Sequence, residues 1–338
     1  MHPFEAPHAD AELLSKPIKE LGLRLEGSPL EKYVLQLYRE LERKGLKRFR
    51  PRCYLTDEWG CPDQEPVIGI PFYLADPKLQ ALEKSMNDLE DEREILMYLR
   101  HEAGHAFNYA YELYKREDWK AMFGPFRRPY RERYRPVPFS RAFVRHIAGW
   151  YAQKHPDEDF AETFAVWLTP RSSWRKRYRG WGALRKLRYV ERMGRLFGDA
   201  EPVRAIGETD VTVEEMEGTL GDFYRDTTAD ESHAIADLAL DTDLTDIFVK
   251  STSRRRNGIR PAADVLAARR KEIVDKVTYW TGVRRPLVKR LVESIEDRVR
   301  ALNLAALTGR ESVYVVEITA YTTTLAMNYL TRGRFTQP

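Results

Sequence analysis

The chain has 338 residues, of which 43% are hydrophobic and 12% aromatic, so a wholly disordered protein is excluded. No stretch approaches the roughly 18 consecutive apolar residues of a membrane span, and the N-terminal residues lack the basic and apolar regions of a secretion signal. Two cysteines, Cys53 and Cys61, are too few for a disulfide framework. We therefore expect a soluble cytoplasmic protein with reduced cysteines and no membrane partner.

The net charge of +4 conceals three blocks of alternating sign. Residues 111–200 contain 21 Lys and Arg against 10 Asp and Glu, 201–250 contain 3 against 14, and 251–310 contain 15 against 6. Such blocks either complement one another within a fold or steer charged partners. We favour the first interpretation.

The first predicted elements follow an irregular lead-in over residues 1–27. A helix is expected from Ser28 to about Gly45, because Ser is a good N-cap residue and Gly commonly ends a helix. Segments 48–55 and 67–74 are predicted to form two strands, which a turn-rich loop connects.

Helical patterns dominate the middle of the chain. A long helix is predicted over about 90–114, where apolar residues recur at spacings of three and four. A basic loop with four prolines follows over 123–139, and helices are expected over 140–151 and 156–168. The stretch 171–198 is basic and helix-prone.

The last part of the chain is predicted to be mostly helical. A helix is expected over 232–249 within the acidic block, and three more over 262–332. We therefore predict an α+β domain over residues 28–200, followed by a mostly helical region over 201–338.

The chemically informative motif is His-Glu-Ala-Gly-His at residues 101–105. On a helix His101 and His105 share one face, so both imidazoles can bind one Zn²⁺. Glu102 can then act as general base on a metal-bound water. Gly104 inside a helix costs about 1 kcal/mol relative to Ala, which indicates close backbone packing there. The alternative is an ordinary amphipathic helix with two solvated histidines.

A zinc site with two histidines and a water needs one more protein ligand. The strongest candidate lies on the helix that begins at Pro156, where Glu158 and Glu162 are four residues apart and share a face. Three other candidates are histidines further along the chain: His146, His155 and His233.

HEAGH followed some fifty residues later by EDFAETF resembles the glutamate zincins. The resemblance is closest to the lethal-factor-like branch and to a group of bacterial zinc-binding metallopeptidases, and it covers about residues 90–170. It implies a zincin-like fold in which a small sheet packs on the active-site helix. Nothing beyond residue 200 is explained by it.

The resemblance also implies roles for particular residues. It makes Glu158 the third zinc ligand beside His101 and His105. Glu162 is then the acceptor of the outer N–H of His101, which fixes the orientation of that ring.

A tyrosine seven residues before the ligand glutamate is a further feature of this branch, and Tyr151 occupies that position. The resemblance implies that Tyr151 donates to the oxyanion of the tetrahedral intermediate, although His146 could take this part. Asp159 departs from the family pattern, because an aromatic residue usually follows the ligand glutamate.

Together these features predict a zinc metallopeptidase with one Zn²⁺ per chain. Glu102 would take the proton of a zinc-bound water as it attacks the peptide bond, and the partner is a peptide or protein substrate. The predicted strand 67–74 is the candidate edge for pairing with substrate. The loop 123–139 could form a wall of the cleft and favour acidic peptides or a carboxylate terminus, or could be a solvated loop paired with the acidic block. Its arginines are Arg127, Arg128, Arg131, Arg133 and Arg135.

Two other functions remain as alternatives. The first is a binding protein of the zincin fold, in which a structural or vestigial zinc site accompanies charged blocks that contact a partner. The second is nucleic-acid binding through residues 171–195, where aromatic side chains alternate with arginines. At helical spacing we expect these aromatics to lie in the core, so we do not expect a nucleic-acid partner.

Overall fold

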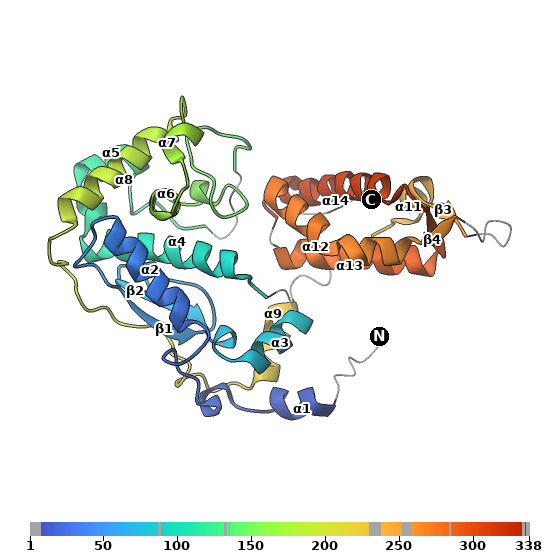
Figure 1. Cartoon of the computed structure of the whole chain (residues 1–338), viewed down its shortest axis with the longest axis horizontal. Helices are drawn as coiled ribbons and strands as arrows, with labels where there is room; N and C mark the ends of the chain where they lie inside the picture. The colour runs from blue at the N-terminus through green and yellow to red at the C-terminus, as the bar shows by residue number, and fades with distance from the viewer. Residues whose placement is uncertain are drawn as a thin grey trace. The chain divides into compact units, whose positions relative to one another are not determined.

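The computed structural model describes residues 8–86, 89–131, 134, 136–229, 238–251, 258–283, 285–332 and 335. The chain divides into two compact units, Met1–Asp226 and Thr227–Pro338 (Figure 1). Both units combine helices with a small sheet, which is compatible with the predicted α+β class. None of the described helices is long and apolar enough to cross a membrane.

The sheet of the first unit has two parallel strands, with Tyr54 opposite Gly69. The second predicted strand ends early, because its last residues form a short 3-10 helix. The strands and their flanking helical elements are α1 (His8–Leu14), η1 (Ile18–Leu21), α2 (Glu31–Arg43), β1 (Arg52–Thr56), β2 (Val67–Pro71), η2 (Phe72–Ala75) and α3 (Pro77–Met86).

The edge of β2 that faces away from β1 is occupied at Gly69. Gly69 donates its N–H to the carbonyl oxygen of Gly60 at 2.7 Å and accepts the N–H of Gly60 at 3.3 Å. The edge expected to pair with a substrate is therefore already paired at its centre with another segment of the chain.

The long predicted helix is present as α4 (Glu92–Ala110) and lies between β2 and α6 (Pro156–Leu168) in Figure 1. Its N-terminus is fixed by a capping box, in which Asp91 accepts the backbone N–H of Glu94 and the Glu94 carboxylate accepts the N–H of Asp91. Every residue of α6 is buried. The two helices therefore form the centre of the unit.

The backbones of α4 and α6 approach each other closely at Gly104. A Cβ atom at this position would lie 2.7 Å from the Cα and 2.9 Å from the carbonyl oxygen of Ala161. Both neighbours are backbone atoms, so they cannot move aside without shifting α6. The close packing expected at Gly104 is confirmed.

One charged pair connects α6 to α8 (Ala183–Phe197). The Asp159 carboxylate, 1% exposed, lies 2.5 Å from Nζ of Lys186, and the lysine ammonium lies 4.1 Å from the ring centre of Phe143. Burial raises the pKa of Asp159 to about 7 although Lys186 opposes this rise. Asp159 thus forms a buried ion pair that connects the two helices.

The predicted helix over 140–151 is not formed. Gly149 and Trp150 adopt positive φ angles of 90° and 51°, which a continuous right-handed helix does not allow. The remaining helical elements of this unit are η3 (Leu113–Lys115), α5 (Glu117–Phe123), η4 (Tyr151–Gln153), α7 (Trp174–Arg177) and α9 (Leu220–Ala229), whose last residues extend past the unit boundary.

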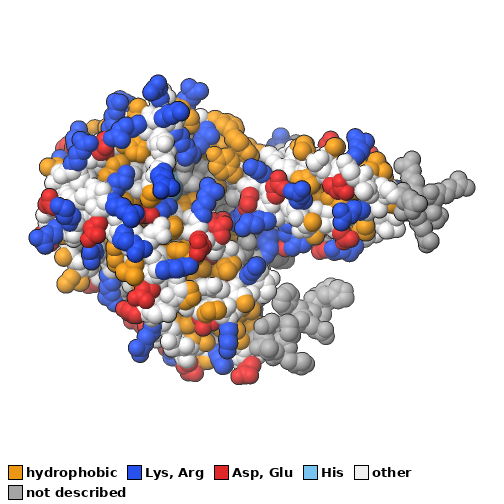
Figure 2. Space-filling view, viewed as in Figure 1, with side chains coloured by type: hydrophobic (Ala, Val, Ile, Leu, Met, Phe, Trp, Pro, Cys, Tyr) orange, Lys and Arg blue, Asp and Glu red, His pale blue; other side chains and the backbone are white. Residues whose placement is uncertain are grey.

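Most of the aromatic residues of the basic stretch point into the core, as expected, while Trp181 is half-buried. Trp174, Tyr178 and Tyr189 are at most 4% exposed, so none of them presents a ring face on which a base could stack. Lys and Arg side chains spread over the part of the unit that carries α7 and α8 (Figure 2).

Residues 201–226 pack within the first unit, although the sequence analysis placed them in the C-terminal region. The N–H of Val213 donates to the carbonyl of Leu55 at 2.9 Å, and the N–H of Ile18 donates to the carbonyl of Gly218 at 3.0 Å. These bonds tie the segment to β1 and to the N-terminal lead-in. The first compact unit is therefore longer at both ends than residues 28–200.

The second unit has its own apolar core and a three-stranded antiparallel sheet in the order β3-β5-β4. The three helices predicted over 262–332 are present, while strands of two to four residues were too short to predict. Part of the predicted helix 232–249 lies outside the described residues. The elements are α11 (Asp241–Ile247), β3 (Val249–Lys250), β4 (Ile259–Pro261), α12 (Ala262–Thr281), α13 (Arg285–Ala301), β5 (Leu304–Leu307) and α14 (Glu311–Arg332).

Replacing Gly104 by Ala is expected to destabilise the first unit. Ala favours a helix by about 1 kcal/mol, but its methyl group overlaps Ala161 and overpacking costs about 1–3 kcal/mol. The net loss should appear as a lower denaturation midpoint in urea. Gly218→Ala is the control, because its new Cβ would meet nothing closer than 3.8 Å. Equal urea denaturation midpoints for the two variants would contradict the close contact between Gly104 and Ala161.

The buried ion pair of α6 and α8 should show strong energetic coupling. Asp159→Asn or Lys186→Met alone leaves one buried charge without its partner, which costs about 3 kcal/mol. The double variant should lose less unfolding free energy than the two single variants lose together. A double-mutant cycle measured by denaturant unfolding tests this. Arg185→Met, at an exposed position of the same helix, should change stability little. Additive losses would show that the pair is not coupled.

Candidate metal centre

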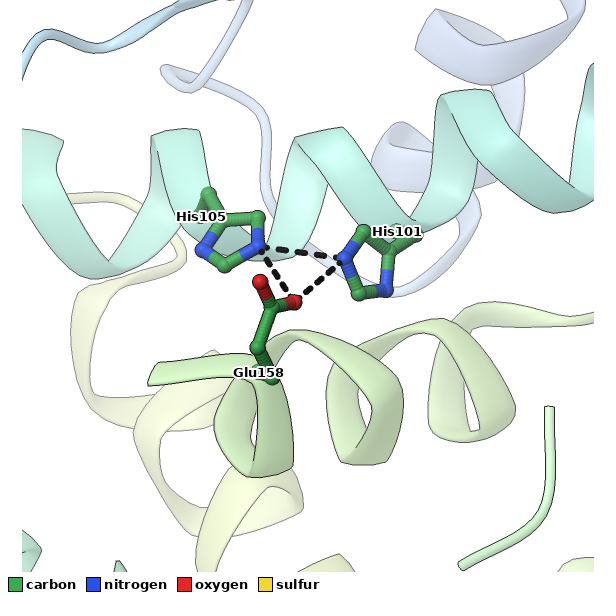
Figure 3. Close-up of side chains that lie close together, drawn as sticks. All are labelled: His101, His105 and Glu158. Atoms are coloured by element: carbon green, nitrogen blue, oxygen red, sulfur yellow. Dashed lines mark hydrogen bonds and ion pairs between the residues drawn. The ribbon is translucent and has the colours of Figure 1, made fainter. Parts of the chain in front are cut away.

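Three buried side chains from α4 and α6 meet at one point (Figure 3). Nε2 of His101 lies 3.1 Å from Nε2 of His105, and Oε2 of Glu158 lies 3.0 Å and 3.2 Å from these two nitrogens. The three predicted ligand residues therefore share one site. It is the single group of three or more His, Cys, Asp and Glu side chains with metal-ligand spacing among the residues that the structure describes.

Glu162 orients the His101 ring from the side away from this point. Its Oε1 lies 3.0 Å from Nδ1 of His101, and its Oε2 accepts the backbone N–H groups of His146 and Ile147 at 3.2 and 3.0 Å. The carboxylate is completely buried. Its position agrees with the predicted one, and the two backbone donors keep it in place.

Asp157 orients the His105 ring in the same way, and the sequence analysis missed it. Its Oδ2 lies 2.7 Å from Nδ1 of His105 and accepts the hydroxyl of Tyr109 at 2.5 Å, while Oδ1 accepts the amide of Asn108 at 2.7 Å. The available signal was the helical spacing, since Asn108 and Tyr109 follow His105 by three and four residues.

These residues fit a zinc ion. Nδ1 of each ring is hydrogen-bonded to a carboxylate, so both Nε2 atoms face Oε2 of Glu158. Two imidazoles and one carboxylate are a donor set that zinc commonly has in catalytic sites. The acidic side chains around the two imidazoles are all buried, and such a concentration of negative charge favours a divalent cation. These acidic residues are Glu102, Asp157, Glu158 and Glu162.

The pKa values of the histidines reflect their acidic surroundings. Burial lowers the pKa of His101, but Glu158 and Glu162 outweigh burial and raise it to about 9. Burial likewise opposes protonation of His105, yet Asp157 and Glu158 raise its pKa well above the usual value. Burial raises the pKa of Glu158, but the two histidines outweigh burial and hold this pKa well below the usual range.

Glu102 follows His101 on α4 and is 6% exposed. Burial raises the pKa of its carboxyl group, with a further contribution from Glu158 and Asp157. A carboxylate with a raised pKa is a stronger proton acceptor near neutral pH.

Two tyrosine hydroxyls reach the other oxygen of the ligand glutamate. Tyr151 donates to Oε1 of Glu158 at 3.2 Å, and its ring centre lies 5.6 Å from that of His101. Tyr130 donates to the same oxygen at 2.6 Å. The sequence analysis identified Tyr151 but not Tyr130, because no spacing rule connects a residue of the Pro-rich loop to the helix.

The remaining histidine candidates have other partners. Nε2 of His146 lies 3.0 Å from the carbonyl oxygen of Met97, so its ring faces the α4 backbone. Nδ1 of His155 accepts the N–H of Asp157 at the start of α6, and Nε2 of His155 donates to the carbonyl of Arg128. His146 and His155 therefore do not join the cluster, and His233 lies outside the described residues.

The candidate cleft arginines lie on the segment that carries Tyr130. The side chains of Arg127, Arg128 and Arg131 are exposed. The segment is attached to α6 through the backbone of Arg128, as described above. Arg133 and Arg135 lie outside the described residues.

Residues 64–175 match the model of a family described as "Putative zinc-binding metallo-peptidase". The matched stretch is about a third of the chain and contains the three side chains of the cluster. No curated protein and no solved structure matches the chain. Over this stretch the chain is thus similar to zinc-binding metallopeptidases, and its His101, His105 and Glu158 are compatible with zinc binding.

Zinc affinity should increase with pH up to about 9. Below that pH His101 holds a proton in the metal-free protein, and zinc binds only the neutral imidazole. The stability of the metal-free protein should instead decrease with rising pH. Protonated His101 stabilises the fold fully below pH 6.5, and this stabilisation is lost as the pH rises through 9. Chelator competition and thermal unfolding measure the two trends.

Glu162→Gln provides the control for this pH dependence. The variant removes one of the three carboxylates that raise the pKa of His101, so the pH at which its zinc affinity levels off should be lower. A zinc affinity that is constant between pH 6.5 and 9 would contradict the assignment.

Proposed function

We propose that this chain is a zinc-dependent peptidase that hydrolyses peptide bonds. The observation that carries the proposal is the buried cluster of His101, His105 and Glu158 with Glu102 on the same helix. Zinc bound there would polarise the scissile carbonyl and lower the pKa of a water molecule.

The side chains of the chain supply the proton transfers. Glu102 accepts a proton from the attacking water and passes it to the leaving amine, for which its raised pKa is suited. Tyr151 donates its hydroxyl to the oxyanion that develops on the substrate. Asp157 and Glu162 keep both imidazoles oriented throughout the reaction.

We place the protein among the glutamate zincins, in the lethal-factor-like branch. Support comes from the position of Tyr151, seven residues before Glu158 and hydrogen-bonded to it, and from the bond between Glu162 and His101. The substrate is a peptide or protein, and Arg127 and Arg131 near Tyr130 favour one with acidic groups.

The number of ligands favours an enzyme over a structural zinc protein. A structural zinc site usually takes four protein ligands, whereas a catalytic site takes three and leaves a position for water. Within the described part of the chain the cluster has three members.

The decisive variant is Glu102→Gln. It should retain one zinc ion per chain and lose about 10²–10⁴-fold in peptide hydrolysis, because the carboxylate acts on protons and does not bind the metal. Metal analysis after purification without added metal measures the first quantity, and cleavage of a peptide library measures the second.

Two further variants complete this test. His101→Ala combined with His105→Ala should lose the zinc, while Glu117→Gln, at a side chain that is 89% exposed, should keep both zinc and activity. Equal cleavage by the wild type and Glu102→Gln would refute the peptidase, and unchanged zinc in the double histidine variant would refute the site.

A further inference from the structure

The two oxygens of the Glu158 carboxylate have different partners. Oε2 lies within hydrogen-bond distance of both imidazoles, and the dashed lines that Figure 3 draws from the carboxylate to the rings all start at this oxygen. Oε1 instead accepts hydrogen bonds from Tyr130 at 2.6 Å and Tyr151 at 3.2 Å, and the two hydroxyl oxygens are 3.4 Å apart. The Tyr130 bond has the length of a charge-assisted O–H···O⁻ bond.

Tyr130 reaches this oxygen from a segment that is fixed to the start of α6. Nε2 of His155 donates to the Arg128 carbonyl at 2.7 Å, and the rings of His155 and Tyr130 are 5.4 Å apart. The ammonium group of Lys154 lies 4.3 Å from the ring centre of Tyr130. Tyr130 is 50% exposed, so its ring covers the ligand carboxylate while its outer face meets solvent.

The two hydroxyls cannot have the same role during the proposed reaction. A phenol has one proton to donate, so Tyr151 releases Oε1 of Glu158 when it donates to the substrate oxyanion. Tyr130 makes the shorter bond to that oxygen, and its ring lies against His155, which is itself bonded to the Arg128 carbonyl of the same segment. The Tyr130 hydroxyl can therefore remain bonded to Oε1 of Glu158 when Tyr151 donates to the substrate.

We propose that Tyr130 is a positioning residue, which keeps Oε1 of Glu158 hydrogen-bonded so that only Oε2 is offered to the metal while Tyr151 turns to the substrate. This inference rests on the proposed function. A carboxylate that bound through both oxygens would occupy the position that a catalytic zinc site leaves for water. Tyr130 thus preserves the open position.

The test uses Co²⁺ in place of zinc, because its visible absorption reports coordination without any substrate. Tyr130→Phe keeps the ring and removes the hydroxyl. We expect about 10-fold weaker Co²⁺ binding, as for other groups that orient metal ligands, and weaker d–d absorption as Glu158 binds through both oxygens. Tyr134→Phe is the matched control, since the Tyr134 hydroxyl donates to the Gly149 carbonyl at 2.8 Å; its spectrum should not change.

Tyr151→Phe separates positioning from catalysis. This variant should keep the wild-type Co²⁺ spectrum, because Tyr130 still holds Oε1, and should lose peptide hydrolysis. A Tyr130→Phe protein with wild-type spectrum and affinity would overturn the inference and leave the proposed function standing. Equal spectral changes in both variants would also overturn it. A wild-type protein that binds neither Co²⁺ nor Zn²⁺ would overturn both proposals.

Discussion

The close approach of α4 and α6 at Gly104 is the constraint on which the candidate site depends. Two of the three clustered donors lie on one helix and the third lies on the other. A Cβ atom at Gly104 would overlap the backbone of Ala161, so glycine at this position sets the separation of the two helices across which the donor atoms meet. The sheet and the remaining helices hold this pair of helices together, for instance through the buried ion pair between Arg100 and Glu40 of α2.

The first turn of α6 concentrates negative charge where a helix tolerates it best. Asp157, Glu158 and Asp159 follow one another at the N-terminus, where the helix dipole favours anions. Because consecutive residues of a helix point in different directions, the three carboxylates have different sets of partners. Asp157 meets His105, Glu158 meets both imidazoles, and Asp159 meets Lys186 on α8. One acidic turn thereby joins α6 to both α4 and α8.

Helical periodicity explains which parts of the site the sequence could predict. The pairs His101 with His105 and Glu158 with Glu162 are fixed by a spacing of four, so their shared faces follow from the sequence. Tyr130 depends on how a loop packs against a distant helix, and no local rule contains that information.

The same limit applies to the fold. The long helices followed from their patterns, but the missing helix before Tyr151 depends on the positive φ of Trp150, which an aromatic residue rarely adopts. The return of 201–226 onto β1 depends on hydrogen bonds between residues far apart in the sequence, and no local pattern predicts which of them will meet.

The hydrogen bonds of Asp157 and Glu162 have a consequence for the thermodynamics of metal uptake. They hold the rings of His105 and His101 in single rotamers before any ion arrives. The conformational entropy of these side chains is therefore lost when the chain folds rather than when the metal binds. A site preorganised in this way would take up a metal ion with little rearrangement, and metal exchange would then depend on access and proton release.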